Sequence, residues 1–273
     1  MKNKIKVLRI ITSLDPKFGG PSKTIIDSSI ALSNQGFKID ILTADLGNSN
    51  FFKSKNIRII NKGPRFGNYA LNFKLFNWLS KHRNDYDLFI VHGIWEFNTL
   101  IARILLKKKY FVFIHGQLDP FFKSNLIKKI KKQIYWHLIE KKNLLLSRSL
   151  ILTSEGEKKS LKHTFVNTNG IKKTIVRYGI NQPKFNKNKA LRYFYKKFPN
   201  LKNKRFLLFL GRFHEKKGCD ILIEAIKKLS DQNINIKVLL AGPNNNYKKK
   251  LMDLSDNYGL KNNIFWSDII LDN

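Results

Sequence analysis

The residues with the clearest chemical pattern lie in an eight-residue stretch, Gly211–Gly218, with the sequence GRFHEKKG. Arg212 offers a planar guanidinium that matches phosphate oxygens, and Lys217 offers a point charge. The glycines at the two ends, Gly211 and Gly218, let the backbone come close to a ligand. In outline, this combination of glycines and cations is a binding site for a diphosphate.

A strand and a helix are predicted on either side of this stretch. The apolar run 206–210 predicts a short buried strand of a parallel sheet, and apolar residues recur at helical spacing over 219–229. Such a loop lies at the carboxyl end of its strand, where open α/β sheets bind ligands, and the helix start adds partial positive charge. A solvated basic loop in a lysine-rich protein is the alternative, and both interpretations stay open.

The composition favours anionic partners. The chain has 273 residues, with 52 Lys and Arg against 19 Asp and Glu, and this net charge of +33 suits nucleic acid, acidic lipid or phosphorylated ligands. A single cysteine, Cys219, excludes a disulfide framework and fits a reducing compartment. Lys6 and Arg9 interrupt the first apolar run, so no signal peptide is expected, and no apolar run approaches the ~20 residues of a membrane span. We expect a cytoplasmic protein, or one peripheral to the inner face of the plasma membrane.

The first 43 residues predict a strand–helix–strand unit. Strands are expected at 5–14 and 38–43, and the helix between them ends near Asn34. Gly19 and Gly20 stand where this helix begins, so a phosphate or a sugar hydroxyl can approach the backbone there. A plain tight turn is the alternative for this glycine pair.

Two further predicted strands, 87–91 and 110–114, each end in the dipeptide His-Gly. Because parallel strands end at one edge of a sheet, His92 and His115 should both lie at the carboxyl edge. Structural and catalytic roles are both open, and His115 is the better catalytic candidate. The six histidines lack zinc-site spacing, and Asp85-Tyr86-Asp87 precedes a strand, so no metal is expected.

Residues 126–146 predict a long helix in which lysines alternate with apolar and aromatic residues. This pattern suits an anionic membrane surface, and a helix packed on the core with a solvated lysine face is the alternative. Along the whole chain we expect an α/β protein with three parts: a domain over 1–180, a polar and basic linker over 181–204, and a second domain over 205–273.

Taken together, these landmarks resemble the family 4 group of retaining glycosyltransferases that use nucleotide sugars. The GT-B fold of that group combines two Rossmann-like domains, and the resemblance covers nearly the whole chain. It rests on FGGP at 18–21, ALSNQG at 31–36, VHGIW at 91–95, HGQLDP at 115–120, and LGRFHEKKG at 210–218 with LIEAI at 222–226.

The resemblance implies roles for the donor-side residues. Arg212 and Lys217 would hold the diphosphate of the donor and stabilise charge that develops on the leaving group. Gly211 would lie in the same donor site, and Gly19 and Gly20 would border the donor phosphate and sugar. No cofactor beyond the nucleotide-sugar donor is implied, and no metal is needed where two cations neutralise the diphosphate.

The resemblance also implies that His115 faces the transferred sugar. The acceptor, a glycan or a lipid-linked glycan, would bind the first domain near His92, Trp95 and the aromatic segment 69–82. The chain departs from the family's pattern because it ends at Asn273, before the glutamate pair expected later in the second domain. About three strands, half of a Rossmann sheet, are therefore expected there, and we expect a truncated second domain.

The expected function is a hexosyltransferase-type sugar transfer in surface polysaccharide or envelope assembly. One alternative is a truncated relative without catalysis. The other is a basic binding module for anionic lipid or nucleic acid. The sequence contains no zinc finger, helix-turn-helix or aromatic RNA-binding signature, so no specific nucleic-acid partner is expected.

Overall fold

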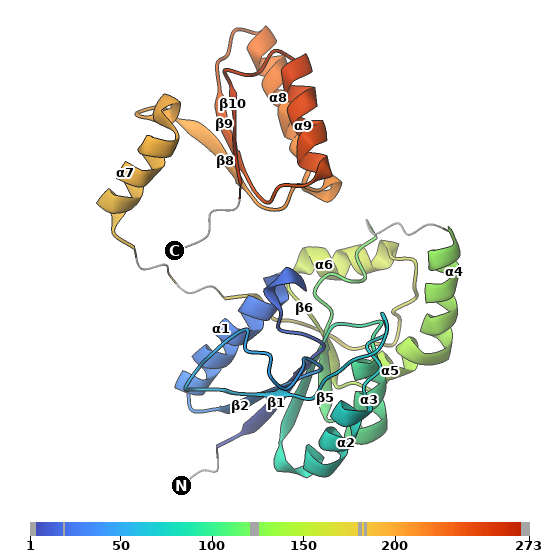
Figure 1. Cartoon of the computed structure of the whole chain (residues 1–273). Helices are drawn as coiled ribbons and strands as arrows, with labels where there is room; N and C mark the ends of the chain where they lie inside the picture. The colour runs from blue at the N-terminus through green and yellow to red at the C-terminus, as the bar shows by residue number, and fades with distance from the viewer. Residues whose placement is uncertain (1–3, 19, 121–125, 180–181, 183–184, 269–273) are drawn as a thin grey trace. The chain divides into compact units, whose positions relative to one another are not determined.

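The computed structural model describes residues 4–18, 20–120, 126–179, 182 and 185–268. The chain divides into two compact units, Met1–Gln182 and Pro183–Asn273 (Figure 1). Each unit has its own parallel sheet and its own hydrophobic core. The α/β class predicted from the sequence is therefore confirmed.

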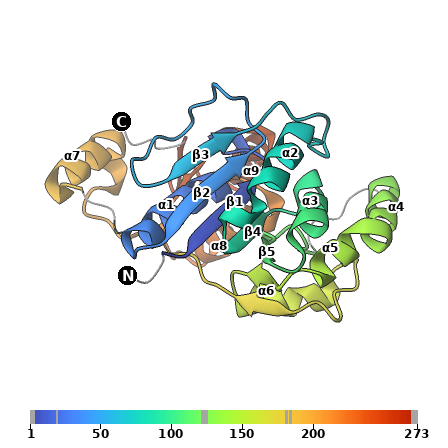
Figure 2. The ribbon, with the colours of Figure 1, turned by 90° about the horizontal axis from the view of Figure 1, so that it is seen from below.

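The first unit is built on a seven-stranded sheet in the order β3-β2-β1-β4-β5-β6-β7, and all neighbouring strands are parallel. Figure 2 shows β3, β2, β1, β4 and β5 side by side. The strands are β1 (Lys6–Ile11), β2 (Lys38–Thr43), β3 (Arg58–Asn61), β4 (Leu88–His92), β5 (Tyr110–Phe113), β6 (Ser149–Leu152) and β7 (Lys173–Ile175). The helices are α1 (Gly20–Asn34), α2 (Phe73–His82), α3 (Phe97–Leu106), α4 (Leu126–Tyr135), α5 (Lys141–Leu145) and α6 (Glu155–Ser160).

Helices cover both faces of this sheet, which is why its strands read as nearly continuous apolar runs. Successive side chains of a strand point to opposite faces. Val7 and Ile11 of β1 accordingly pack in one cluster with Ile25 of α1. Leu8 and Ile10 pack in a second cluster that contains residues of α2 and α3. His92 and Arg9 occupy strand positions of the first set, on the face that α1 covers.

The long helix predicted over 126–146 is present as α4 and α5, joined by a π-helical turn, Trp136–Glu140. π-turns within α-helices occur frequently at functional sites. Here the turn directs Trp136 and Glu140 into the core, where both are completely buried. Among the described helices, none combines the length and apolar character that crossing a bilayer requires.

The second unit has a three-stranded parallel sheet in the order β10-β9-β8 within its described residues. Its elements are α7 (Lys187–Lys197), β8 (Phe206–Leu210), a 3₁₀ turn (Glu215–Lys217), α8 (Cys219–Asp231), β9 (Lys237–Ala241), α9 (Asn246–Asn257) and β10 (Ile264–Ser267). Its main core joins residues of α8, β9 and α9, among them Ile223, Val238 and Leu251.

Two expectations for this region differ from the structure. The stretch expected as a linker, 181–204, contains α7, whose Phe194 packs with Leu201 and Leu239 of the second unit. Its high lysine content concealed one apolar helix face. The strand 206–210 is expected to be buried, but Leu208 of β8 is 58% exposed and Leu210 is 72% exposed, and within the described residues β8 pairs only with β9.

Candidate active site

The loop between β1 and α1 is fixed by hydrogen bonds that it donates to two carboxyl groups, each of which follows a strand far away in the sequence. Asp45, which follows β2, accepts from the Ser13 hydroxyl at 2.5 Å and from the Leu14 amide at 2.8 Å. The Thr12 hydroxyl donates to the carboxylate of Glu96, which lies between β4 and α3. Burial raises the pKa of Glu96, although the bond from Thr12 opposes this effect. The loop is therefore held at the carboxyl edge of the sheet by two buried or partly buried carboxyl groups.

This loop leads to the predicted glycine pair. Gly20 is the first residue of α1, whereas Gly19 lies outside the described residues. A Cβ atom built at Gly20 would meet no atom within 4 Å, so open space adjoins the start of the helix. The orphan amides of a helix start can bind an anion, and the role of this pair in donor binding stays a prediction.

The structure brings the two histidines together at the carboxyl edge. Nδ1 of His92 lies 3.0 Å from Nε2 of His115, and their rings stack with centroids 5.2 Å apart. Burial, followed by the charges of His115 and Arg9, holds the pKa of His92 well below its ordinary value. Burial, followed by Arg9, lowers the pKa of His115 to about 4. Both imidazoles are thus neutral at physiological pH.

Trp95 lies away from these histidines, in an aromatic cluster. Its ring stacks on Phe165 with centroids 6.0 Å apart, and it contacts Tyr135 and Trp136. The ammonium of Lys132 lies 5.3 Å from its centroid. The backbone of Trp95 has φ +69, an uncommon conformation for a residue with a side chain. These ring contacts order the β4–α3 loop. The acceptor-side role of Trp95 stays a prediction.

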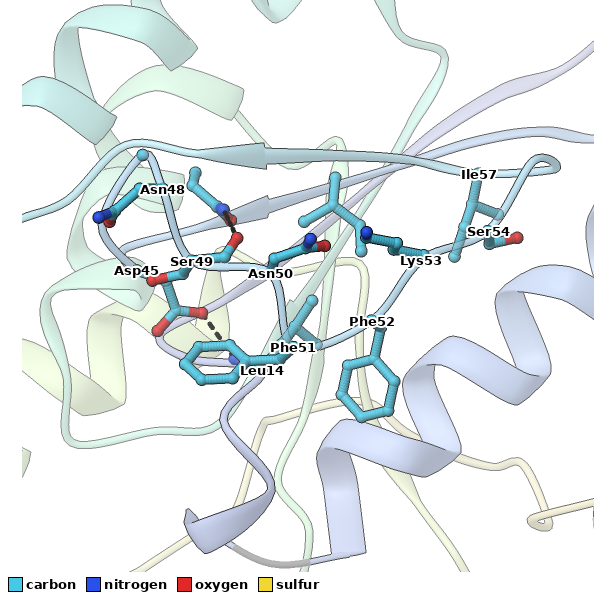
Figure 3. Close-up of a pocket in the computed structure, with 13 residues that line it drawn as sticks. Leu14, Asp45, Asn48, Ser49, Asn50, Phe51, Phe52, Lys53, Ser54 and Ile57 are labelled. Carbon is cyan, nitrogen blue, oxygen red and sulfur yellow. Dashed lines mark hydrogen bonds between the residues drawn. The ribbon is translucent and has the colours of Figure 1, made fainter.

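A hollow of about 440 Å³ lies along β3, between this strand and the loop that joins β2 to it (Figure 3). Asn61 of β3 fixes this loop, since its Nδ2 donates to the Ser49 carbonyl at 2.8 Å. The rim carries the exposed residues Asn50, Phe51 and Lys53. Amide and hydroxyl groups beside an aromatic ring are the groups that bind a neutral polar ligand such as a sugar.

In the second unit, the predicted diphosphate loop connects β8 to α8. Arg212 and Lys217 are both exposed, and neither forms an ion pair among the residues that the structure describes. Gly218 has φ +64, a left-handed conformation that favours glycine, and it directly precedes the first residue of α8. Two exposed cations and a helix start therefore occur in one short loop, as a bound anion would require.

The turn after β9 comes very close to this loop. A Cβ atom built at Gly242 would lie 2.0 Å from the carbonyl oxygen of Gly211. Only glycine fits there without moving the backbone. The Gly211 amide donates to the Ala241 carbonyl at 2.9 Å, so β9 holds the first residue of the predicted diphosphate loop.

Sequence reasoning missed three residues that order the edge of the first unit: Glu96, Asp45 and Tyr178. Each comes shortly after a strand, and position after a strand was the signal that could have identified them. Tyr178 follows β7, and its hydroxyl hydrogen-bonds to Nδ1 of His115. Within the described ranges, no three or more His, Cys, Asp or Glu side chains are grouped as a metal would require.

Each of the two units matches the model of a known protein family. The family model described as Glycosyltransferase Family 4 matches residues 18–184, and the model described as Glycosyl transferases group 1 matches residues 193–268. A 45-residue segment is 49% identical to granule-bound starch synthase 1 of Pisum sativum. That segment is 16% of this chain and 6% of the starch synthase, so the match spans a small part of that relative.

Solved structures of similar fold cover almost the whole chain. Sucrose-phosphate synthase from Thermosynechococcus elongatus matches with a TM-score of 0.68 at 18% identity, over 98% of this chain and 71% of that protein. A glycosyltransferase from Rickettsia africae matches with a TM-score of 0.67 at 17% identity, over 99% and 69%. Because the first family model spans more than half of the residues, the chain belongs to Glycosyltransferase Family 4, a family of transferases with the GT-B type of fold.

Proposed function

We propose that this chain transfers a sugar from a nucleotide-diphosphate sugar to a glycan or a lipid-linked glycan. The single observation that carries the proposal is the loop Gly211–Gly218, where two exposed cations lie between a strand end and a helix start. Arg212 and Lys217 there bind the diphosphate and stabilise the negative charge that the leaving nucleotide develops. Gly211, held close to Gly242, lets the backbone approach the same group.

For the first unit we propose binding of sugar groups. The start of α1 at Gly20 lies on the same edge of the sheet as His92 and His115, and hydrogen bonds to Glu96 and Asp45 hold the loop before α1. The hollow beside Phe51 is lined by amide and hydroxyl groups as well as by Asp45 and Lys53, and these groups can hydrogen-bond the hydroxyls of a glycan acceptor. An acceptor of this chemistry fits a role in surface polysaccharide or envelope assembly.

We also propose a cytoplasmic protein that contacts the inner face of an anionic membrane through 126–146. Ile130, Ile134 and Leu138 repeat every four residues, and they are 48%, 55% and 66% exposed. Exposed lysines, Lys129 and Lys131, lie beside this apolar stripe. An apolar stripe with flanking lysines binds a membrane surface through both buried area and charge attraction. The exposure of the stripe favours this proposal over a helix packed entirely on the core.

A ligand screen tests the donor proposal. Thermal shift with uridine, guanosine and adenosine diphosphates and their sugar conjugates selects the donor, and calorimetry then measures its affinity. Arg212→Ala or Lys217→Ala should each weaken diphosphate binding by about 1.5–3 kcal/mol, the range for hydrogen bonds to charged groups. The uncharged nucleoside should be affected little, because it lacks the group that these cations bind.

Lys228→Ala is the matched control, since Lys228 is an exposed lysine at the other end of α8. It should leave the diphosphate affinity unchanged. If Lys228→Ala weakens binding as much as Lys217→Ala does, the general positive charge of the chain binds the ligand and the loop is not the site. Equal loss for nucleoside and diphosphate would show damage to the fold instead.

A further inference from the structure

Three side chains on the α1 face of the first sheet form a linear hydrogen-bonded chain. The Tyr178 hydroxyl contacts Nδ1 of His115, and Nε2 of His115 lies 3.0 Å from Nδ1 of His92. The rings are nearly parallel: Phe113 and His115 meet at 8° with centroids 4.5 Å apart, and Phe113 and Tyr178 meet at 9°. Both nitrogens of His115 are therefore engaged within the protein, and its ring has none left for a ligand.

The direction in which these hydrogen bonds donate follows from the buried end of the series, at His92. Nε2 of His92 is completely buried and has no partner among the described residues. If that atom carried the proton, a buried N–H donor would lack an acceptor, which is the rarer and costlier arrangement. A lone pair on Nε2 leaves the proton on Nδ1 of His92. This N–H then donates to His115, and the Nδ1–H of His115 donates to the oxygen of Tyr178.

The surrounding charge keeps both imidazole rings neutral, as this proton arrangement requires. Arg9 is a buried cation on this face, and its charge acts to lower the pKa of both His92 and His115. Its guanidinium is fixed by the Ile25 carbonyl at 3.0 Å and by the Ser28 hydroxyl at 2.6 Å. A fixed positive charge disfavours further protonation, so both rings stay neutral and each carries one proton. In this series of hydrogen bonds, neutral His92 donates to neutral His115, and His115 donates to Tyr178.

Tyr178 is the exposed end of the series. Its residue is 44% exposed, whereas His92 is 4% exposed. Since its oxygen accepts the proton of His115, its own hydroxyl proton is free to point outward. Burial raises the pKa of Tyr178 to about 12, so this hydroxyl remains protonated at physiological pH. A hydroxyl whose oxygen already accepts a hydrogen bond is polarised into a better donor.

We propose that the Tyr178 hydroxyl, rather than the ring of His115, is the hydrogen-bond donor that this edge presents to a bound sugar. His92 and His115 are positioning residues that fix the direction of the donor. The ligand half of this inference rests on the proposed function, because it takes a sugar group as the ligand of this edge. The ligand needs one oxygen that can accept this hydrogen bond, such as the oxygen of a sugar hydroxyl.

The proton positions can be measured without any ligand. Long-range ¹H–¹⁵N spectra of the full chain distinguish imidazole Nδ1–H from Nε2–H, and Tyr178→Phe identifies the His115 signals through their shift. We expect Nδ1–H on both His92 and His115. Nε2–H on either ring would reverse the direction of the hydrogen bonds and overturn the inference.

The ligand half is tested by calorimetry with UDP-glucose, GDP-mannose and ADP-glucose and with the corresponding sugar-free diphosphates. Tyr178→Phe should weaken binding of the nucleotide sugar about 3- to 10-fold, as expected for one neutral hydrogen bond. The sugar-free diphosphate should bind equally well, and Tyr193→Phe, at an exposed tyrosine of α7, should change neither affinity.

The outcomes separate the two proposals. No binding of any nucleotide sugar by the unsubstituted chain would overturn the proposed function and the ligand half with it. Binding that Tyr178→Phe leaves unchanged, or an equal loss for nucleotide sugar and diphosphate, would overturn only the role of Tyr178.

Discussion

Replacing Glu140 with Gln should remove a pH-dependent loss of stability from the first unit. The side chain is completely buried, and its Oε2 accepts from the Thr99 hydroxyl at 3.1 Å and from Asn143 Nδ2 at 3.3 Å. Its Oε1 has no partner among the described residues. Burial raises the pKa of Glu140 to about 7 from an ordinary value of 4.5, and bonds from Thr99 and Tyr135 lower it only in part.

The sign follows from the raised pKa. The folded chain binds the Glu140 proton more tightly than the unfolded chain does, so this stabilisation is complete below pH 4.5 and is lost as pH rises to about 7. At about 1.4 kcal/mol per pH unit, the interval from 4.5 to about 7 corresponds to about 3 kcal/mol. Gln keeps the shape and does not ionise. The free energy of unfolding of Glu140→Gln, relative to the unsubstituted chain, should therefore rise by about 3 kcal/mol across that interval.

Urea titration at the two ends of the interval measures this difference. A Trp266→Phe background removes the tryptophan of the second unit, so fluorescence then reports on the first unit through Trp78, Trp95 and Trp136. Glu155→Gln, at an exposed glutamate of α6, should show no such change with pH. A Glu140→Gln difference that stays constant with pH, or falls as pH rises, would refute the burial argument.

Two further predictions concern the second unit and the lysine-rich helix. Gly242→Ala should destabilise the second unit by about 1–3 kcal/mol, because its Cβ would overlap the Gly211 carbonyl, and should weaken diphosphate binding. Gly47→Ala, where a Cβ meets no atom within 4 Å, is the control, and an equal loss of thermal stability in both variants would contradict the prediction. Changing the four lysines within 128–132 to Gln should weaken binding to anionic vesicles by about 1 kcal/mol per lysine. In co-sedimentation, the same changes at 249–250 should have little effect, and equal binding to neutral vesicles would exclude a charge-based contact.

The elements of the fold could be predicted because their signals are local. Apolar runs placed β1, β2, β4 and β5 within a few residues, and helical spacing placed α8. The same reasoning placed His92 and His115 at one edge, because the end of each strand is marked by His-Gly. The degree of burial was predicted wrongly for β8, because its apolar composition does not show that Leu208 and Leu210 are exposed.

Position after a strand could mark the supporting residues of the site as candidates, but their partners could not be predicted, because each hydrogen bond joins distant parts of the chain. Asp45 accepts a hydrogen bond from the amide of Leu14, which lies 31 residues away in the sequence. Tyr178 is hydrogen-bonded to His115, which lies 63 residues away. No periodicity links such pairs. Gly242 illustrates the same limit, since only the structure shows the Gly211 carbonyl beside it.

Both units bury polar groups, such as Arg9 in the first unit and Lys248 in the second, but the residues proposed to bind ligand differ in exposure. The first unit buries Arg9, His92 and Glu140, each of which costs free energy unless its partners are fixed. A network of this kind holds donors such as Tyr178 in set directions, which suits the recognition of uncharged hydroxyls. The second unit leaves Arg212 and Lys217 exposed, so these cations keep their charge and pay little desolvation before a ligand arrives. This distribution of polar residues supports the proposed division, in which the first unit recognises sugar hydroxyls by direction and the second unit binds phosphate by charge.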